Sequence, residues 1–238
     1  MDWLGAVLDP ARPDEGLTGV CPAGVPVEGM RLLAVEFPWP AAPGGRQPPA
    51  ECYVRGADLT AVYQESPAWP VQVDLVWRPV FPKAQDGILA GIDLLVSVRT
   101  PRLDSRPQLV VRSLLPSSAI FRLTQRAASR WEPVTPRSDC SLTFEPATGA
   151  GCFVFRLPGT GLSYVEIVHP ADFFRDELLC RPGSPGAGLR HPLFPEPLEK
   201  GVILRARLRG LFLPAEDDLR FAGEAYAAFA ASDPPLGT

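Results

Sequence analysis

Apolar and polar side chains alternate along most of the chain, and prolines or glycines interrupt the alternation every few residues. The longest run lies within 87–100, where Ile88 and five further apolar residues occupy every second position up to Val98. A second clear run, over 70–80, places Val71, Val73 and Trp77 on one face. A period of two with one apolar face is typical of half-buried β-strands. Strands as long as 87–100 favour a large sandwich over a small barrel.

The same pattern predicts a series of strands along the chain, which cover residues 30–37, 51–55, 58–64, 70–80, 87–100, 108–115, 119–124, 139–145, 151–157, 161–169 and 201–213. The short connections predict that 87–115 folds as one long hairpin and that 139–145 pairs with 151–157. A further turn is expected at 158–161. Residues 181–197 are rich in Pro and Gly and predict a long irregular loop, while 173–179 predicts a helical turn.

The period changes after Pro214, where Leu219, Tyr226 and Phe229 fall on one helical stripe. We therefore predict one C-terminal helix within 214–233 that packs on the sheets or covers an edge. The expected fold is all-β, a large antiparallel β-sandwich of the supersandwich-like type with long strands. It is expected to form a single domain over 1–238, with residues 1–28 as a Pro/Gly-rich N-terminal arm. Two small β modules joined near 125–138 are the alternative.

Composition narrows the class of protein without naming a function. The net charge is −4 and 21% of residues are charged, which is ordinary for a globular domain and gives no electrostatic reason to expect nucleic acid as a partner. Of 23 basic residues only Lys83 and Lys200 are lysines, a bacterial-like composition that a GC-rich genome explains. No apolar run is long enough to span a membrane, and the first residues lack the pattern of a signal peptide. We expect a soluble cytoplasmic protein.

The five cysteines are widely spaced and form no C-x-x-C pair. That spacing predicts neither a zinc site nor a disulfide scaffold, and it fits a reducing compartment. No metal and no cofactor are therefore predicted. A bridge between Cys140 and Cys152 across a hairpin is the minority alternative.

The chain has only two histidines, and one of them belongs to the sequence Glu166-x-x-His169-x-x-Asp172. These residue types could carry acid–base chemistry, which makes Glu166 and His169 the catalytic candidates. Strand parity opposes a joint site, because an odd spacing places the two side chains on opposite faces. The simpler interpretation is that His169 bonds a backbone group at a strand end and that Asp172 caps the following turn.

Arg205, Arg207 and Arg209 share one face of the predicted strand 201–213 and could hold an anionic or polar ligand. The alternative is pairing with carboxylates on a neighbouring strand, with Glu166 as one potential partner. Trp69 and Trp131 lie in polar, proline-flanked stretches and are expected to be exposed platforms for a sugar ring. These five residues are the predicted ligand-binding set.

No phosphate-binding loop, zinc-protease motif, nucleophile elbow or calcium loop occurs in the sequence. The function expected is therefore a soluble β-sandwich that binds a small molecule, with a saccharide favoured, and an enzymatic role is the less favoured option. The alternatives are a carbohydrate-active enzyme of the sugar-epimerase-like sandwich type, or a structural or assembly protein. The sequence sets neither the ligand nor the oligomeric state. Clustering of the arginines, Glu166 and His169 in one cleft would favour the enzyme.

Overall fold

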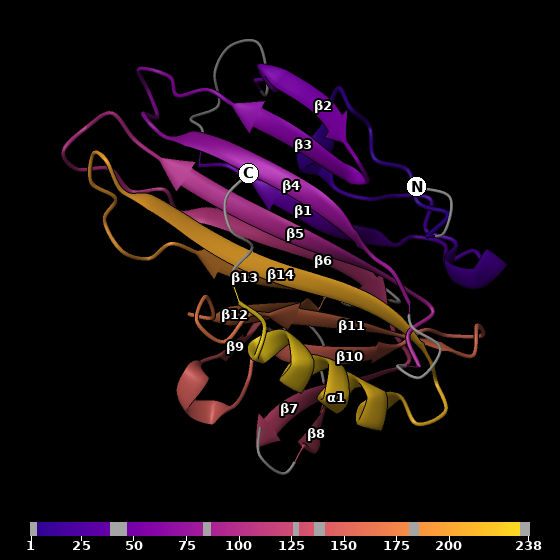
Figure 1. Cartoon of the computed structure of the whole chain (residues 1–238). Helices are drawn as coiled ribbons and strands as arrows, with labels where there is room; N and C mark the ends of the chain where they lie inside the picture. Colours follow the sequence, from indigo (N-terminus) through magenta and orange to yellow (C-terminus); the bar gives the residue numbers. More distant parts are fainter. Residues whose placement is uncertain are drawn as a thin grey trace.

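The computed structural model describes residues 4–38, 47–82, 87–125, 129–135, 141–180 and 186–233. The described chain is nearly all β, with two antiparallel sheets packed face to face and one α-helix against the larger sheet (Figure 1). This confirms the predicted antiparallel β-sandwich. The strands are β1 Arg31–Glu36, β2 Glu51–Arg55, β3 Asp58–Tyr63, β4 Gln72–Val80, β5 Ala90–Arg99, β6 Leu109–Pro116, β7 Ala119–Gln125, β8 Arg130–Val134, β9 Ser141–Phe144, β10 Cys152–Arg156, β11 Leu162–Val168, β12 Asp176–Cys180, β13 Gly186–Leu193 and β14 Ile203–Pro214.

The larger sheet has nine strands in the order β2-β3-β4-β5-β14-β11-β10-β7-β8, and the smaller has five in the order β1-β6-β13-β12-β9. Both sheets contain strands from before and after residues 125–138, so the two halves of the chain share the same sheets. The longest pairing joins β14 to β5, from Ile203 opposite Arg99 to Phe212 opposite Ala90. This central pair holds the middle of the large sheet.

The main core lies between the sheets and is built from the alternating apolar positions. Leu75 and Trp77 of β4 and Ile92 and Val96 of β5 are fully buried in it. The small sheet contributes the matching positions of β6, β12 and β13. The period-two pattern in the sequence therefore identified the inner face of the long strands correctly.

The helix α1, Asp218–Ala230, covers the outer face of the large sheet over β10, β11 and β14 (Figure 1). Tyr226 and Phe229 pack there with Val165 and Ile167 of β11 in a second apolar core. At the helix start, Asp218 accepts two hydrogen bonds from the guanidinium of Arg156, at 2.8 and 2.9 Å, and one from the Ser163 hydroxyl at 2.7 Å. These contacts fix the predicted C-terminal helix to the sheet.

Three strands were missed in the sequence. β13 lies within 181–197, where an irregular loop was predicted, and β12 replaces the helical turn predicted over 173–179. β8 was not predicted at all. In β13 the residues that alternate with the buried positions include two glycines, an arginine and a proline, so the segment has the composition of a loop although its buried face is regular.

Two predicted hairpins are also wrong. β5 and β6 belong to different sheets, and β9 pairs with β12 rather than with β10. The connections 100–108 and 145–151 cross the interior distance of about 10 Å between packed sheets instead of turning back within one sheet. The hairpin of β10 and β11 around 158–161 is confirmed.

Candidate functional site

A network of polar side chains crosses the apolar interior between the two sheets. His191 of β13 lies at its centre, with Nε2 2.8 Å from Oε1 of Glu166 on β11 and Nδ1 2.5 Å from Oδ1 of Asp176 on β12. All three side chains are fully buried. Because Glu166 belongs to the large sheet and the other two belong to the small sheet, the network joins the sheets through charge-assisted hydrogen bonds.

The second carboxylate oxygen of Glu166 accepts two hydroxyl hydrogen bonds, from Ser113 at 2.6 Å and from Tyr164 at 2.7 Å. Ser113 in turn accepts a hydrogen bond from the backbone N–H of Leu33, at 3.0 Å. Room for the Tyr164 ring depends on Gly210 of β14, where a Cβ atom would lie 2.3 Å from the tyrosine oxygen. The backbone of β14 therefore helps to position the tyrosine on Glu166.

Electrostatics make the imidazolium form of His191 stable in this interior. Burial alone would lower the pKa of His191, but the charges and hydrogen bonds of Asp176 and Glu166 outweigh it and raise that pKa to about 10. Burial raises the pKa of Asp176, opposed by His191 and by the guanidinium of Arg122. The network thus holds two carboxyl groups around one cationic histidine, and the nearby charge of Arg122 also acts on Asp176, which limits the cost of burying these groups.

This network is buried from solvent, and of its carboxylate oxygens only Oδ2 of Asp176 has no hydrogen-bond partner among the described residues. Both ring nitrogens of His191 are bonded to carboxylates, and Glu166 uses both of its oxygens within the protein. Chemistry on a bound molecule requires a catalytic group within hydrogen-bond reach of it. In this arrangement the network acts as a structural link between the sheets, so the place for a ligand lies elsewhere.

An open cleft of about 680 Å³ lies where strands of both sheets end. Its walls come from 145–147, from 171–175 before β12, from 194–196 after β13 and from 204–206 of β14. A second hollow of about 380 Å³ adjoins it and shares Phe174, Arg175, Phe194 and Pro195. Both volumes lie in the range of small-molecule sites.

The cleft combines apolar surface with polar groups that have no partner among the described residues. Phe174 is 43% exposed there, while the carboxylates of Glu145 and Glu196 and the guanidinium of Arg205 make no ion pair with a described side chain. Arg175 is more constrained, since it bonds Glu177 at 3.2 Å and lies 5.6 Å from the centre of the Phe174 ring. An apolar wall with a few convergent polar groups is the usual form of a ligand site.

The edge of β14 forms one side of the cleft. β11 pairs with β14 as far as Val168, and the Arg207 backbone is then bonded by the His169 N–H at 2.9 Å and by the Asp172 carboxylate at 2.9 Å. Backbone groups of every second residue face the same edge of a strand. The N–H and C=O of Arg205 therefore face the cleft, and no described residue bonds them.

Two residues beside the cleft have a left-handed backbone conformation. Phe194 has φ of 55° and Gln108, the residue before β6, has φ of 49°, and both line the smaller hollow. The β6–β13 register continues from Leu109 opposite Leu193, so these two strained residues face each other at the sheet end. Such left-handed conformations cost about 1–3 kcal/mol for residues other than glycine and cluster at functional sites.

Asp172 is the cleft carboxyl with a shifted pKa. Burial raises its pKa, against the hydrogen bond from the Arg207 backbone and the charge of Arg207, which lower it. A carboxyl with a raised pKa in a cleft can hold a proton at higher pH than an exposed aspartate.

The structure separates the two catalytic candidates, as strand parity predicted. Glu166 faces the interior network, whereas His169 follows the end of β11 on the outer side, with its ring edge-on to Phe229 of α1 at 5.4 Å. Nδ1 of His169 accepts a hydrogen bond from the backbone N–H of Ala171 at 3.2 Å. The prediction that His169 bonds a backbone group is thus met. Asp172 was expected to cap a helical turn and instead bonds the β14 backbone.

The three arginines of β14 do not form one binding surface. Arg209 makes a bidentate pair with Asp93 of the neighbouring strand, at 2.7 and 2.8 Å, and stacks on the ring of Phe229 at 4.3 Å. Arg207 bonds the carbonyl oxygens of Ser232 and Asp233 at the end of the helix. Pairing with a neighbouring strand was the alternative, but the partner is Asp93 and not the inward-facing Glu166. Only Arg205 lines the large cleft.

Neither expected tryptophan platform is an exposed ring, since Trp69 is buried and Trp131 is partly buried. Trp69 is 6% exposed and belongs to the main core beside Phe37, with ring centres 5.8 Å apart. Trp131 packs with the second core beneath α1. Their proline-flanked, polar sequence context concealed this burial, because each ring turns inward from an irregular segment or an edge strand. Trp69 and Trp131 are therefore not exposed platforms, whereas Arg207 and Arg209 line a separate hollow of about 170 Å³ that shares no residue with the large cleft.

Three further findings concern the described part of the chain. Cys152 is a free, buried thiol, and Cys140 lies outside the described residues. Among the described side chains, no group of three or more His, Cys, Asp or Glu is arranged to hold a metal ion. No described helix is long and apolar enough to cross a membrane.

Known proteins resemble this chain in fold but not in sequence. No family model and no curated protein sequence matches the chain. Among solved structures, a candidate mutarotase from Salmonella typhimurium is similar with a TM-score of 0.54 and 10% identity, over 84% of this chain and 85% of that one. A candidate aldose 1-epimerase from Escherichia coli K12 has a TM-score of 0.50 and 12% identity, over 68% and 67% of the two chains.

A third similar structure is a TPR-domain containing protein from Parabacteroides distasonis, with a TM-score of 0.52 and 11% identity. The match covers 85% of this chain and 39% of that protein. At these identities the likeness is one of fold: the chain has the β-sandwich seen in these three proteins.

Proposed function

We propose that the protein binds a saccharide in the cleft between 171–175, 194–196 and the edge of β14. The observation that carries the proposal is the exposed ring of Phe174 in a cleft where Glu145, Glu196 and Arg205 make no ion pair with a described side chain. A sugar has an apolar face of C–H groups, which packs on an aromatic ring, and hydroxyl groups that bond carboxylate and guanidinium groups in pairs.

The backbone of Arg205 supports the same ligand class. Its N–H and C=O face the cleft and offer a fixed donor and acceptor, which suits a neutral hydroxyl group. The lining side chains also carry both signs of charge, with Glu145, Asp172 and Glu196 beside Arg175 and Arg205. This mixture fits a neutral or weakly charged sugar better than a polyanion.

The names of two structures with the same fold, a candidate mutarotase and a candidate aldose 1-epimerase, agree with a sugar ligand. The two adjoining hollows give room for more than one sugar ring. We therefore expect binding to strengthen from a monosaccharide to a disaccharide.

The test is titration calorimetry of the protein with a panel of neutral mono- and disaccharides, followed by the Phe174→Ala variant. Loss of the ring should weaken the affinity for the tightest-binding sugar by about 5- to 30-fold, since an aromatic contact of this kind contributes roughly 1–2 kcal/mol. Phe81→Ala is the matched control, because Phe81 is exposed and lies outside the cleft.

Arg205→Ala should also lower the affinity for the sugar. Arg102→Ala should leave that affinity unchanged, because Arg102 is an exposed arginine outside the cleft. Absence of binding by every sugar, or equal affinity of wild type and Phe174→Ala, would remove the proposal.

Catalysis on the sugar is the second candidate, and one observation favours it. Asp172 lines the cleft with a raised pKa, and a protonated carboxyl can donate to a ring oxygen while Glu145 or Glu196 accepts a proton. Interconversion of aldose anomers, followed by polarimetry, distinguishes the two functions. An enzyme would accelerate it and lose the acceleration in Asp172→Asn, whereas a binding protein would leave the rate at its uncatalysed value.

A further inference from the structure

The two sheets end in four edge strands, and three of them carry features that oppose pairing with another chain. β8 contains Pro133 and a register shift against β7. β9 has only four residues. β1 is irregular between Arg31 and Ala34, and a bridge between Leu17 and Leu32 joins it to the N-terminal arm. Proline, shortness, bulges and covering segments are the usual means by which proteins protect sheet edges.

Among the described residues, β2 has no bulge, no proline and no covering segment. Its five residues, Glu51–Arg55, pair with β3 in a continuous register, and no described strand pairs with its other edge. It contains no proline and no lysine. An unprotected strand of this kind presents backbone donors and acceptors that another strand can bond.

The side chains of β2 are unusually exposed for apolar residues. Tyr53 is 47% exposed and Val54 is 67% exposed. Cys52 packs against the main core, so Val54, two residues further along, points to the same inner side of the sheet without a cover. An apolar side chain left uncovered on the core side of an edge strand is stabilised when the sheet continues past it.

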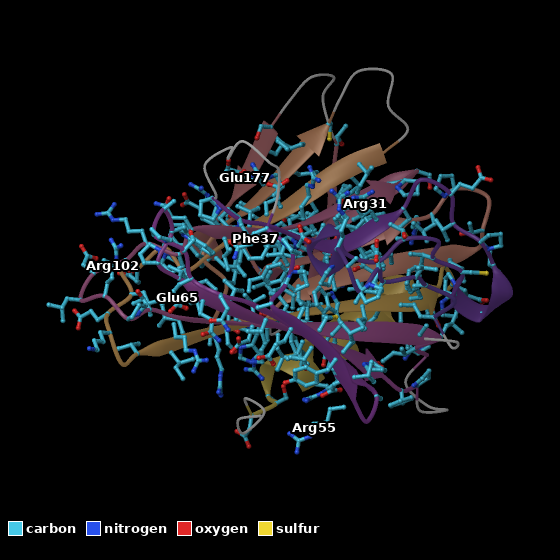
Figure 2. All side chains as sticks on the ribbon, turned by 90° about the horizontal axis from the view of Figure 1, so that it is seen from above. Arg31, Phe37, Arg55, Glu65, Arg102 and Glu177 are labelled. Carbon is cyan, nitrogen blue, oxygen red and sulfur yellow. The ribbon has the colours of Figure 1, made fainter. Side chains whose placement is uncertain are left out.

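The sequence of β2 is complementary to itself. When two copies of Glu-Cys-Tyr-Val-Arg pair antiparallel about Tyr53, each Glu51 lies opposite the Arg55 of the other copy, and each Cys52 lies opposite a Val54. Neither Glu51 nor Arg55 forms an ion pair within the described chain, and the Arg55 side chain projects away from the ribbon (Figure 2). Opposite charges at paired positions favour a register, and like charges disfavour it.

We propose that two copies of this protein associate through β2, with the two strands antiparallel about a two-fold axis at Tyr53. The nine-stranded sheets of the two copies would then form one continuous sheet. Such an isologous contact closes on itself and gives a dimer rather than a fibre. The cleft at the ends of β12, β13 and β14 stays open in this arrangement, since β14 is separated from β2 by three strands.

The test is sedimentation velocity of the whole chain over a concentration series, with charge-reversal variants at the two ends of β2. Glu51→Arg places like charges opposite each other twice, once on each side of the axis, and should raise the dimer dissociation constant by about tenfold or more. Arg55→Glu should do the same. The double variant Glu51→Arg/Arg55→Glu restores opposite charges at both positions and should restore the dimer.

Glu132→Arg is the matched control, because Glu132 is an exposed carboxylate on β8, the opposite edge of the same sheet. It should leave the dimer unchanged. A wild type that stays monomeric from about 1 μM to about 1 mM overturns the proposal, and so does a dimer that neither single reversal weakens or that the double reversal fails to restore. No saccharide enters these measurements, so their outcome is independent of the cleft.

Discussion

Replacing His191 with alanine removes the positive charge that bridges two fully buried carboxylates, Glu166 and Asp176. The carboxylates would then face each other across an apolar interior without their shared cation. Breaking a buried charged contact by removing one partner typically costs about 3–5 kcal/mol. The packing of the imidazole between the sheets is lost as well, so the effect should be large.

The raised pKa of His191 gives a second, independent value for the stability that this residue contributes. His191 keeps its proton to about pH 10, against an ordinary value of 6.5. At 1.36 kcal/mol for each pKa unit, the folded state gains on the order of 5 kcal/mol from the protonated histidine. Both arguments predict that His191→Ala loses about 3–5 kcal/mol of the free energy of unfolding at pH 7, a large part of the ~5–15 kcal/mol typical of a folded protein.

The sign of the pH dependence follows from the raised pKa. The contribution of His191 is complete below pH 6.5, where the unfolded chain also binds the proton, and it is lost as the pH rises through about 10. The difference in stability between wild type and His191→Ala should therefore shrink between pH 6.5 and 10. Groups away from the network affect both proteins alike, so the difference reports on His191 together with its carboxyl partners, Asp176 and Glu166.

The assay is urea unfolding followed by circular dichroism, at pH values from 6 to 10. His191→Ala/Glu166→Gln should recover part of the loss, because one of the two uncompensated charges is then neutral. A loss below about 1 kcal/mol at pH 7, or a difference that does not change with pH, would refute the claim that a charged histidine holds the sheets together.

Two further substitutions test the contacts that position the network and the helix. Gly210→Ala should lower the free energy of unfolding by about 1–3 kcal/mol, since the added Cβ would lie 2.3 Å from the Tyr164 oxygen. Gly188→Ala is the control and should be nearly neutral, because its added Cβ would lie 3.7 Å from the nearest atom. Equal melting temperatures of the two variants would contradict this. Asp218→Asn should cost about 1–3 kcal/mol by weakening the contact with Arg156. Burial alone would raise the pKa of Asp218, but hydrogen bonds from Arg156 and Ser163 lower it. The stability that the Asp218 carboxylate contributes should therefore be lost as the pH falls through this lowered pKa. Equal acid-unfolding midpoints for wild type and Asp218→Asn would contradict this.

The sequence predicted the architecture because burial follows a period of two in the long strands. Ile92 and Val96 of β5, or Leu75 and Trp77 of β4, are apolar at each inward position, and no tertiary knowledge is needed to assign their face. Sheet membership could not be obtained in this way. A connection such as 100–108 can either turn back or cross to the other sheet, and only the packing of distant strands decides between them.

The network was missed although its signal was present. His191 is in phase with the buried Ala187, Leu189 and Leu193 of β13, and Glu166 is in phase with Tyr164 and Val168 of β11. A charged residue at an inward position of a strand indicates a buried partner. The signal for β13 was concealed by the glycines and proline at its outward positions, so His191 was assigned to a loop and its phase was not considered.

The cleft could not be predicted from the sequence. Its walls come from 145–147, 171–175, 194–196 and 204–206, which are distant in the chain and meet only because two sheets end at the same place. Phe174 gave no local signal that distinguishes it from other exposed side chains, and Arg205 was predicted only as part of an arginine stripe whose other two members lie outside the cleft. Strand parity did succeed in excluding a joint site of Glu166 and His169, because that argument depends only on spacing along one strand.

The location of a bound sugar is the most direct test of the proposed function. We would determine a crystal structure of the protein with the saccharide that binds most tightly. The account predicts a sugar ring against Phe174, with hydroxyl groups bonded to the cleft carboxylates and to the backbone of Arg205. A sugar bound at another surface, with the cleft unoccupied, would contradict it.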